Sequence, residues 1–242
     1  MSDSRGQRPP GEQRPPAVAI FDLDGTLVVG QTQVLLVRFL RSARVVSRSF
    51  VVGTALWFLA YKAGVVKVTE ASRAKGAEIL KGLREEEVKA LMSRFTEEVM
   101  VPRLHPAATA ALAGHQAEGD SIVVVSAALD PVVEALCRRL GVAEYAGVGC
   151  EIEDGRYTGR LSGVIPYSGE KARIAARFIA EHGAHPADCW AYADHDTDLE
   201  LLRSVGHPVA VNPRLRLRSE AEREGWPILL SSDPYPGGVR NG

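Results

Sequence analysis

Two aspartates, Asp22 and Asp24, follow a short apolar run (17–21) and are themselves followed by Gly25 and Thr26. The run is typical of a buried strand, and residues i and i+2 of an extended segment point the same way. Both carboxylates can therefore face one pocket at the carboxyl end of the strand, where open α/β sheets bind their ligands. Two anions held close together raise each other's pKa. A divalent cation that prefers oxygen ligands removes this penalty, so the pair predicts a magnesium site.

Polar residues also stand at the ends of two later strands. Ser126 ends an apolar run that precedes a helix, and a hydroxyl just before a helix N-terminus suits a phosphate group. Asp194 ends another apolar run, and Asp198 falls on the first turn of the helix behind it. If these strands are neighbours of the first one, their polar ends meet at the same pocket.

These residues occur in the order of a known set of motifs. The string Ala17–Leu27 resembles the first motif of the haloacid dehalogenase superfamily, whose members mostly transfer phosphoryl groups through an aspartate. Ser126, Lys171 and the pair Asp194 and Asp198 resemble the second, third and fourth motifs. A hairpin predicted after Cys150 and the Gly-Trp-Pro sequence at 225–227 are similar to the branch that includes phosphoserine phosphatase.

The resemblance implies a role for each aspartate. Asp22 is expected to be the nucleophile that takes the phosphoryl group, and Asp24 to protonate the leaving oxygen and then activate water. Magnesium is expected to bind between Asp22, the backbone carbonyl of Asp24 and Asp194. Asp198 is expected to orient a metal-bound water.

The other two motif residues are expected to bind phosphate. Ser126 would donate to a phosphate oxygen, and Lys171 would neutralise the phosphate and the nucleophile, a task that suits a flexible point charge. Without the resemblance, Lys171 is an ordinary exposed lysine. The fourth motif departs from its usual form, because Ala193 replaces a glycine and His195 a small residue. His195 is interpreted as a surface residue, with a supporting role behind the metal ligands as the alternative.

The substrate is less constrained by the sequence. Phosphoserine phosphatases typically place a glutamate after the first motif to hold the substrate ammonium, and Gln31 stands at that position here. Gln31 is therefore the predicted substrate-proximal residue. Gly76 aligns with their cap arginine, although Arg73 and Lys75 are close to it, and both departures count against phosphoserine. Glu70 or Glu78 of the cap could supply the missing negative charge instead.

The resulting prediction is a magnesium-dependent phosphomonoesterase that acts on a small phosphorylated metabolite. Three alternatives use the same residues: phosphoserine phosphatase proper, a phosphatase of a lipid-like phosphate at the membrane surface, and a phosphotransferase to an alcohol acceptor. A catalytically silent binding module is a fourth, and the intact aspartates and lysine count against it.

Alternating strands and helices predict an α/β fold, with a Rossmann-like parallel sheet covered by helices on both faces. The helical region from Thr32 to about Met100 resembles a type-one cap inserted after the first strand. The predicted units are a disordered tail (1–16), a core domain (17–32 and 101–230), a helical cap domain (33–100) and a flexible tail (231–242).

Composition limits the partners and the compartment. The 242 residues carry a formal charge of -1, which predicts no general attraction to nucleic acid. Cys137, Cys150 and Cys189 are far apart, so neither a disulfide framework nor a zinc site is expected, in keeping with a cytoplasmic location. The segment 1–16 lacks the apolar centre of a signal peptide. The expected partner is a small phosphomonoester, and the sequence does not specify an oligomeric state.

The most hydrophobic stretch, 50–66, has three interpretations. It is a buried helix of the cap, a helix that lies on a membrane surface, or a membrane span. Arginines that precede it favour contact with a membrane surface. A span needs about 20 apolar residues, and this stretch is shorter and contains Lys62.

Overall fold

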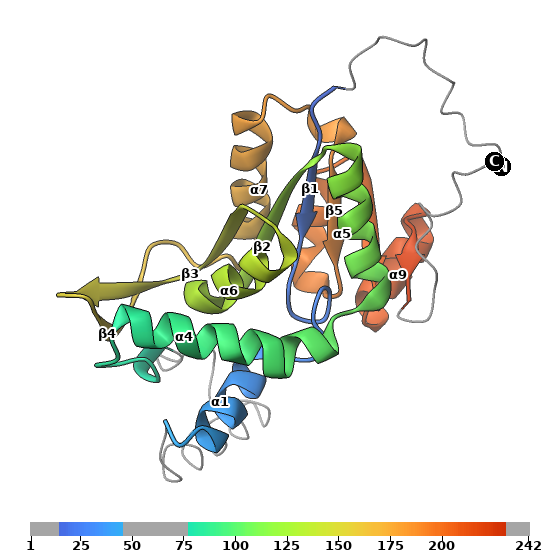
Figure 1. The fold of residues 1–242 in the computed structure, drawn as a ribbon. Helices are drawn as coiled ribbons and strands as arrows, with labels where there is room; N and C mark the ends of the chain where they lie inside the picture. Colours follow the sequence, from blue (N-terminus) through green and yellow to red (C-terminus); the bar gives the residue numbers. More distant parts are fainter. Residues whose placement is uncertain (1–14, 46–76, 231–242) are drawn as a thin grey trace.

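The computed structural model describes residues 15–45 and 77–230, and a seven-stranded sheet forms its centre (Figure 1). The strands are β1 (Val18–Phe21), β2 (Ser121–Leu129), β3 (Glu144–Glu153), β4 (Arg156–Ser162), β5 (Trp190–Ala193), β6 (His207–Val211) and β7 (Ile228–Leu229). Their order is β4-β3-β2-β1-β5-β6-β7, so β1 is the middle strand. Every neighbouring pair is parallel except β3 and β4. The predicted α/β fold with a mostly parallel sheet is confirmed.

Helices connect the strands. They are α1 (Thr32–Ser42), α4 (Glu85–Phe95), α5 (Pro106–Glu118), α6 (Asp130–Leu140), α7 (Gly169–Glu181), α8 (Leu199–Arg203) and α9 (Leu215–Glu224). A π-helical turn, Thr96–Met100, extends α4, and a 3₁₀ turn, Asp196–Asp198, precedes α8. Helical structure at both ends of the predicted region 32–100 agrees with the sequence.

Both faces of the sheet are covered by helices because alternate residues of its strands point to opposite sides. In β1, Ala19 and Phe21 belong to an apolar cluster that includes residues of α5 and α6. Val18 and Ile20 belong to a second cluster with residues of α7, α8 and α9. The strand before Asp22 is therefore apolar on both faces, as expected for a strand in the middle of a buried parallel sheet.

The first cluster also contains the described part of the predicted cap. Apolar residues of α1 and α4 join it, and α1 packs on α4 (Figure 1), with the rings of Phe39 and Phe95 5.4 Å apart. The described part of 33–100 thus shares one apolar core with the sheet, and the division into cap and core domains stays a prediction.

Several predictions concern residues that the structure does not describe. The stretch 50–66, the cap positions around Gly76 and almost all of the two predicted tails lie outside the described ranges. Within 15–45 and 77–230, no helix is both long and apolar enough to cross a membrane.

The predicted hairpin is confirmed, and one strand is longer than expected. Asp154 and Gly155 connect β3 to β4 with φ of 50° and 71°, the left-handed values that such a two-residue turn requires. The strand expected to end at Ser126 instead continues to Leu129. Its pairing with β3 shifts register beyond Val125, so Ser126 lies at an irregularity within β2 rather than at its end. A local apolar run could not show this, because the extension depends on a partner strand.

Candidate active site

The first two aspartates lie at the carboxyl end of the middle strand. Asp22 directly follows β1 and is buried, and its backbone N–H donates to the carbonyl of Tyr192 on β5 at 2.9 Å. Gly25 then turns the chain with φ of 88°, which a residue with a side chain rarely adopts. The turn closes with a hydrogen bond from the Gly25 N–H to the carbonyl of Val28 at 2.8 Å. The turn begins directly after Asp24 and returns the chain, so that Val28 pairs with Asp24 in an isolated bridge.

Asp24 is held by the start of α1. Its Oδ1 accepts a hydrogen bond from the backbone N–H of Thr32 at 2.7 Å. Burial raises the pKa of Asp24 to about 6, with the Thr32 N–H opposing the rise and the Asp22 charge adding to it. A carboxyl group with a pKa near neutrality can give and take a proton at physiological pH, as a general acid and base must.

Lys171 is a buried lysine rather than an exposed one. It lies in the first turn of α7, its residue is only 5% exposed, and its Nζ lies 2.7 Å from Asp22 Oδ1 and 2.9 Å from Asp198 Oδ1. Burial alone would lower the pKa of Lys171, but the two carboxylates outweigh it and hold the pKa above its ordinary value. A permanent positive charge therefore stands beside the predicted nucleophile.

Three buried carboxylates converge beside this lysine. Asp22, Asp194 and Asp198 each place one oxygen within 4.8 Å of the others. Burial, and then the Asp22 charge, raise the pKa of Asp194 to about 7 and that of Asp198 to about 6. A Cβ atom at Gly25 would lie 2.2 Å from Asp194 Oδ2, so the backbone closes tightly around this carboxylate. Crowded, mutually repelling oxygen ligands fit a hard divalent cation such as Mg²⁺.

The converging carboxylates differ in part from the predicted metal ligands. Asp22 and Asp194 are in both sets. Asp198, predicted to orient a water, contributes the third converging carboxylate, whereas the Asp24 side chain faces the Thr32 N–H. The predicted ligand from Asp24 was its backbone carbonyl, and that assignment stays a prediction.

Ser126 and Gln31 occupy different settings. Ser126 is buried on β2, and its Oγ accepts a hydrogen bond from the backbone N–H of Ala128 at 3.1 Å. It lies two residues beyond Val124, the last residue of β2 that pairs with β1, and so near the level of Asp22. Gln31 is exposed at the N-cap of α1, one residue before the Thr32 N–H that holds Asp24.

His195 caps a turn beside the site. Its Nδ1 accepts a hydrogen bond from the Thr197 N–H at 3.1 Å, and its side chain is 31% exposed. This is a structural task at the start of the turn that carries Asp198.

Two residues contact the site without a role predicted for them from the sequence. Thr26 is buried, with its Oγ1 3.4 Å from Asp22 Oδ2. Arg214 follows β6, and its Nε lies 3.9 Å from Asp194 Oδ2. The signal for Arg214 was available, because β6 is parallel to β5 and its carboxyl end reaches the same edge of the sheet.

The raised pKa values predict how stability depends on pH. The folded-state pKa values of three carboxyl groups, Asp24, Asp194 and Asp198, are above the ordinary value of 3.8 that applies in the unfolded state. The folded protein therefore binds these protons more tightly. Their contribution to stability is therefore fully present below about pH 4 and is lost as the pH rises through 6 to 7. In chelator at pH 8, Asp194→Asn is expected to stabilise the protein, on the order of 2–4 kcal/mol.

Thermal or denaturant unfolding of wild type and Asp194→Asn at pH 5 and pH 8 measures this contribution. The difference in unfolding free energy between the two proteins removes the effect of the titrating groups that they share. The gain should be smaller at pH 5. Mg²⁺ should reverse the order at pH 8 by binding the ionised wild-type cluster. An Asp194→Asn protein less stable than wild type in chelator at pH 8 would contradict the prediction.

Comparison with known proteins adds independent findings. A sequence model of the haloacid dehalogenase-like hydrolases matches residues 19–203. A phosphoserine phosphatase of Mycobacterium tuberculosis is 30% identical over 225 residues, which cover 90% of this chain and 73% of the relative. A histidinol-phosphatase of Neisseria meningitidis is 28% identical over 217 residues, 88% of this chain and 97% of the relative. A solved structure from Bordetella pertussis, of a protein with unknown function, has a TM-score of 0.80 at 28% identity and covers 89% of this chain and 99% of its own.

Proposed function

The chain belongs to the haloacid dehalogenase-like hydrolases and is a phosphatase, and from this premise we propose a specific reaction. It is the magnesium-dependent hydrolysis of a small phosphorylated metabolite through an aspartyl-phosphate on Asp22. The observation that carries the proposal is the buried contact of 2.7 Å between Asp22 and Lys171, beside the carboxylates of Asp194 and Asp198.

In the first step, an Asp22 carboxylate oxygen attacks phosphorus and the bond from phosphorus to the ester oxygen breaks. Asp24 gives its proton to the departing oxygen, so an alcohol leaves rather than an alkoxide. In the second step, Asp24 takes a proton from a water molecule as that water attacks phosphorus. Inorganic phosphate leaves and the Asp22 carboxylate is restored. A covalent route of this kind divides one difficult displacement into two easier ones.

Charge stabilisation comes from groups fixed in advance. Lys171 neutralises the nucleophile and then the phosphoryl oxygens, and its burial strengthens the interaction. Ser126 is proposed to donate its hydroxyl to a phosphoryl oxygen. The divalent cation held by the aspartates supplies further positive charge to the phosphoryl group when it is bound.

A panel of phosphomonoesters tests the proposal. The purified protein with Mg²⁺ should release phosphate from at least one ester, and the panel should include phosphoserine and histidinol phosphate, the substrates that the relatives' names suggest. An alcohol acceptor added to the assay separates hydrolysis from transfer to an alcohol, since only transfer yields a new ester. Absence of phosphate release from every ester, by a folded protein that binds Mg²⁺, would overturn the proposal.

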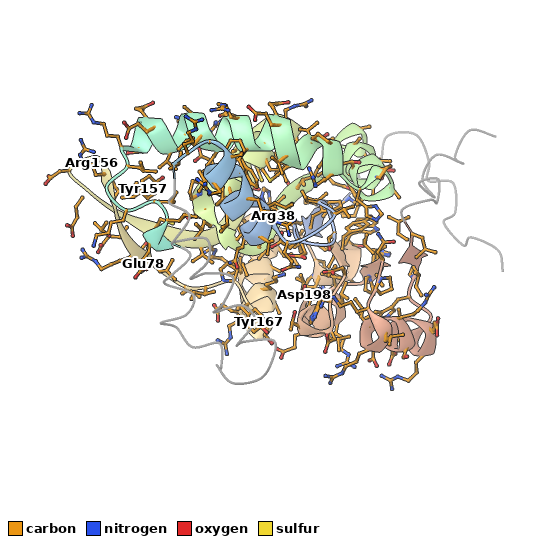
Figure 2. All side chains as sticks on the ribbon, turned by 90° about the horizontal axis from the view of Figure 1, so that it is seen from below. Arg38, Glu78, Arg156, Tyr157, Tyr167 and Asp198 are labelled. Carbon is orange, nitrogen blue, oxygen red and sulfur yellow. The ribbon has the colours of Figure 1, made fainter. Side chains whose placement is uncertain are left out.

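Gln31 predicts that phosphoserine is a poor substrate. A free ammonium held against a neutral amide lacks a charged partner, and losing one side of a buried charge pair typically costs about 2–5 kcal/mol. The kcat/KM for phosphoserine should therefore be roughly 30-fold or more below that of a neutral phosphomonoester. The described alternative acid, Glu78, lies against β4, where a Cβ atom at Gly159 would be 3.4 Å from the Glu78 Cα, and Figure 2 shows it away from Asp198.

Gln31→Glu is the matched variant for this prediction. It should raise kcat/KM for phosphoserine relative to the neutral ester, because it restores a charged partner at the same position. If wild type prefers phosphoserine by a wide margin, the inference from Gln31 is wrong and another residue supplies the charge.

A further inference from the structure

Arg214 is tied to the acidic cluster through its backbone. It follows β6 after Asn212 and Pro213, and it is the N-cap residue of α9. Its N–H donates to the backbone carbonyl of Asp194 at 3.1 Å. Asn212, two residues before Arg214, has a left-handed φ of 40°. The side chain of Arg214 therefore starts from a fixed point at the edge of the sheet where the carboxylates converge.

The guanidinium of Arg214 faces the cluster from the solvent side. Its Nε lies 3.9 Å from Asp194 Oδ2, and its side chain is 57% exposed, whereas that of Asp194 is only 9% exposed. Lys171, with a side chain 6% exposed, serves Asp22 and Asp198 from the interior. Among the described residues, the three carboxylates thus have one buried cation, Lys171, and one solvent-facing cation, Arg214, and an incoming ligand reaches the second more readily.

The charges of the site leave a role for this second cation. Asp22, Asp194 and Asp198 carry three negative charges when ionised, and Lys171 with a divalent cation carries three positive ones. With a proton on Asp24, which the first step requires, these described groups together with the cation sum to zero charge when Arg214 is left out. A phosphomonoester is close to a dianion at neutral pH, so its phosphoryl group still needs a positively charged partner.

We propose that Arg214 is a substrate-binding residue that pairs with the phosphoryl group of the ester, an inference that rests on the proposed function. With a divalent cation held by Asp194, the attraction of that carboxylate for the guanidinium would be offset, and Arg214 would be free to turn to the phosphoryl oxygens. The planar donor fork of arginine matches two oxygens of a phosphate, and such charge-assisted pairs are the stronger hydrogen bonds. Arg214 contacts Asp194, and a carboxylate oxygen of Asp194 lies within 4.8 Å of one of Asp22, so the guanidinium is close to the nucleophile.

Binding of inorganic phosphate to the Mg²⁺-loaded protein tests the proposal without relying on turnover. Calorimetry should show that Arg214→Ala weakens phosphate binding about tenfold, which corresponds to about 1.4 kcal/mol. KM for the best ester should rise by a similar factor, with a smaller change in kcat. Arg214→Lys should retain part of the affinity, since it keeps the charge but loses the fork.

Arg216→Ala is the matched control. Arg216 is an exposed arginine in the first turn of α9, two residues after Arg214, and its Nη1 pairs with Asp196 Oδ2 at 3.1 Å, outside the converging carboxylates. Its removal should leave phosphate affinity and KM within twofold of wild type. Unchanged Tm values check that each variant is folded, and Arg214→Gln serves as a second variant if Arg214→Ala is not.

The outcomes separate this inference from the proposed function. If wild type with Mg²⁺ neither binds phosphate nor hydrolyses any ester, the proposed function fails. If wild type binds phosphate and Arg214→Ala binds it equally well, only the role of Arg214 is overturned. A tenfold loss of Mg²⁺ affinity with unchanged phosphate affinity at saturating Mg²⁺ would also overturn it, because Arg214 would then position Asp194 rather than bind the substrate.

Discussion

Asp22→Asn is expected to abolish turnover, with a loss of at least about 10⁴-fold in kcat, on the scale measured when other enzymes lose their nucleophile. The amide keeps the shape of the side chain but lacks the anionic oxygen that attacks phosphorus. The fold should persist, because the substitution removes one charge from three carboxylates whose oxygens lie within 4.8 Å of one another. We therefore expect a Tm equal to or above that of metal-free wild type.

Asp196→Asn is the control for this variant. Asp196 lies two residues after Asp194 and makes an ion pair with the exposed Arg216, but it is not one of the converging carboxylates. The activity of Asp196→Asn should stay within twofold of wild type. Near-wild-type turnover by a well-folded Asp22→Asn protein would falsify the nucleophile assignment and the covalent route with it.

Removal of the divalent cation is expected to have the second largest effect, a loss of about 10³-fold or more in kcat, since such an ion typically contributes several kcal/mol of charge stabilisation. Chelation leaves Asp22, Asp194 and Asp198 with Lys171 and Arg214 as the described cations within 4 Å of their oxygens. The phosphoryl group then meets uncompensated negative charge. Addition of Mg²⁺ should restore the activity in full.

Substitution of one predicted metal ligand distinguishes specific Mg²⁺ binding from a general effect of salt. Asp194→Asn should need a Mg²⁺ concentration at least about tenfold higher for half-maximal activity, because it loses one anionic ligand of the cluster. Asp196→Asn should behave as wild type. Full activity in a chelator-treated, metal-free sample would show that the cluster has another purpose.

The strand that carries Asp22 is supported by a buried polar network that no motif indicates. His115 on α5 bonds to Asp120 Oδ2 at 2.7 Å through Nδ1 and to the hydroxyl of Tyr192 at 2.8 Å through Nε2. The Tyr192 ring stacks on Phe21 at 4.3 Å, directly before the nucleophile. Phe21, His115 and Tyr192 are far apart in the chain, so only the packed structure brings them together.

The sequence best supported the predictions that depend only on residues close to one another in the chain. Asp22, Asp24, Gly25 and Thr26 stand in one short string whose alternation and turn residues can be read without knowledge of any partner. The apolar runs before Ser126 and Asp194 likewise predict buried strands with polar residues close behind. The hairpin turn at Asp154 follows from two adjacent residues that tolerate left-handed backbone angles.

The tertiary structure decided what depends on strand order. β1 lies between β2 and β5, and α7 packs on β1 and β2, which brings Lys171 to Asp22 across 149 positions of the chain. The same strand order makes Asp198 a member of the carboxylate cluster. It also places Arg214 beside Asp194. The same kind of partner effect extends β2 past Ser126, because a strand ends where its neighbour stops pairing and not where its own apolar run stops. Spacing along the chain describes neighbours in sequence, whereas charge compensation and burial depend on neighbours in space, which the packing of distant elements determines.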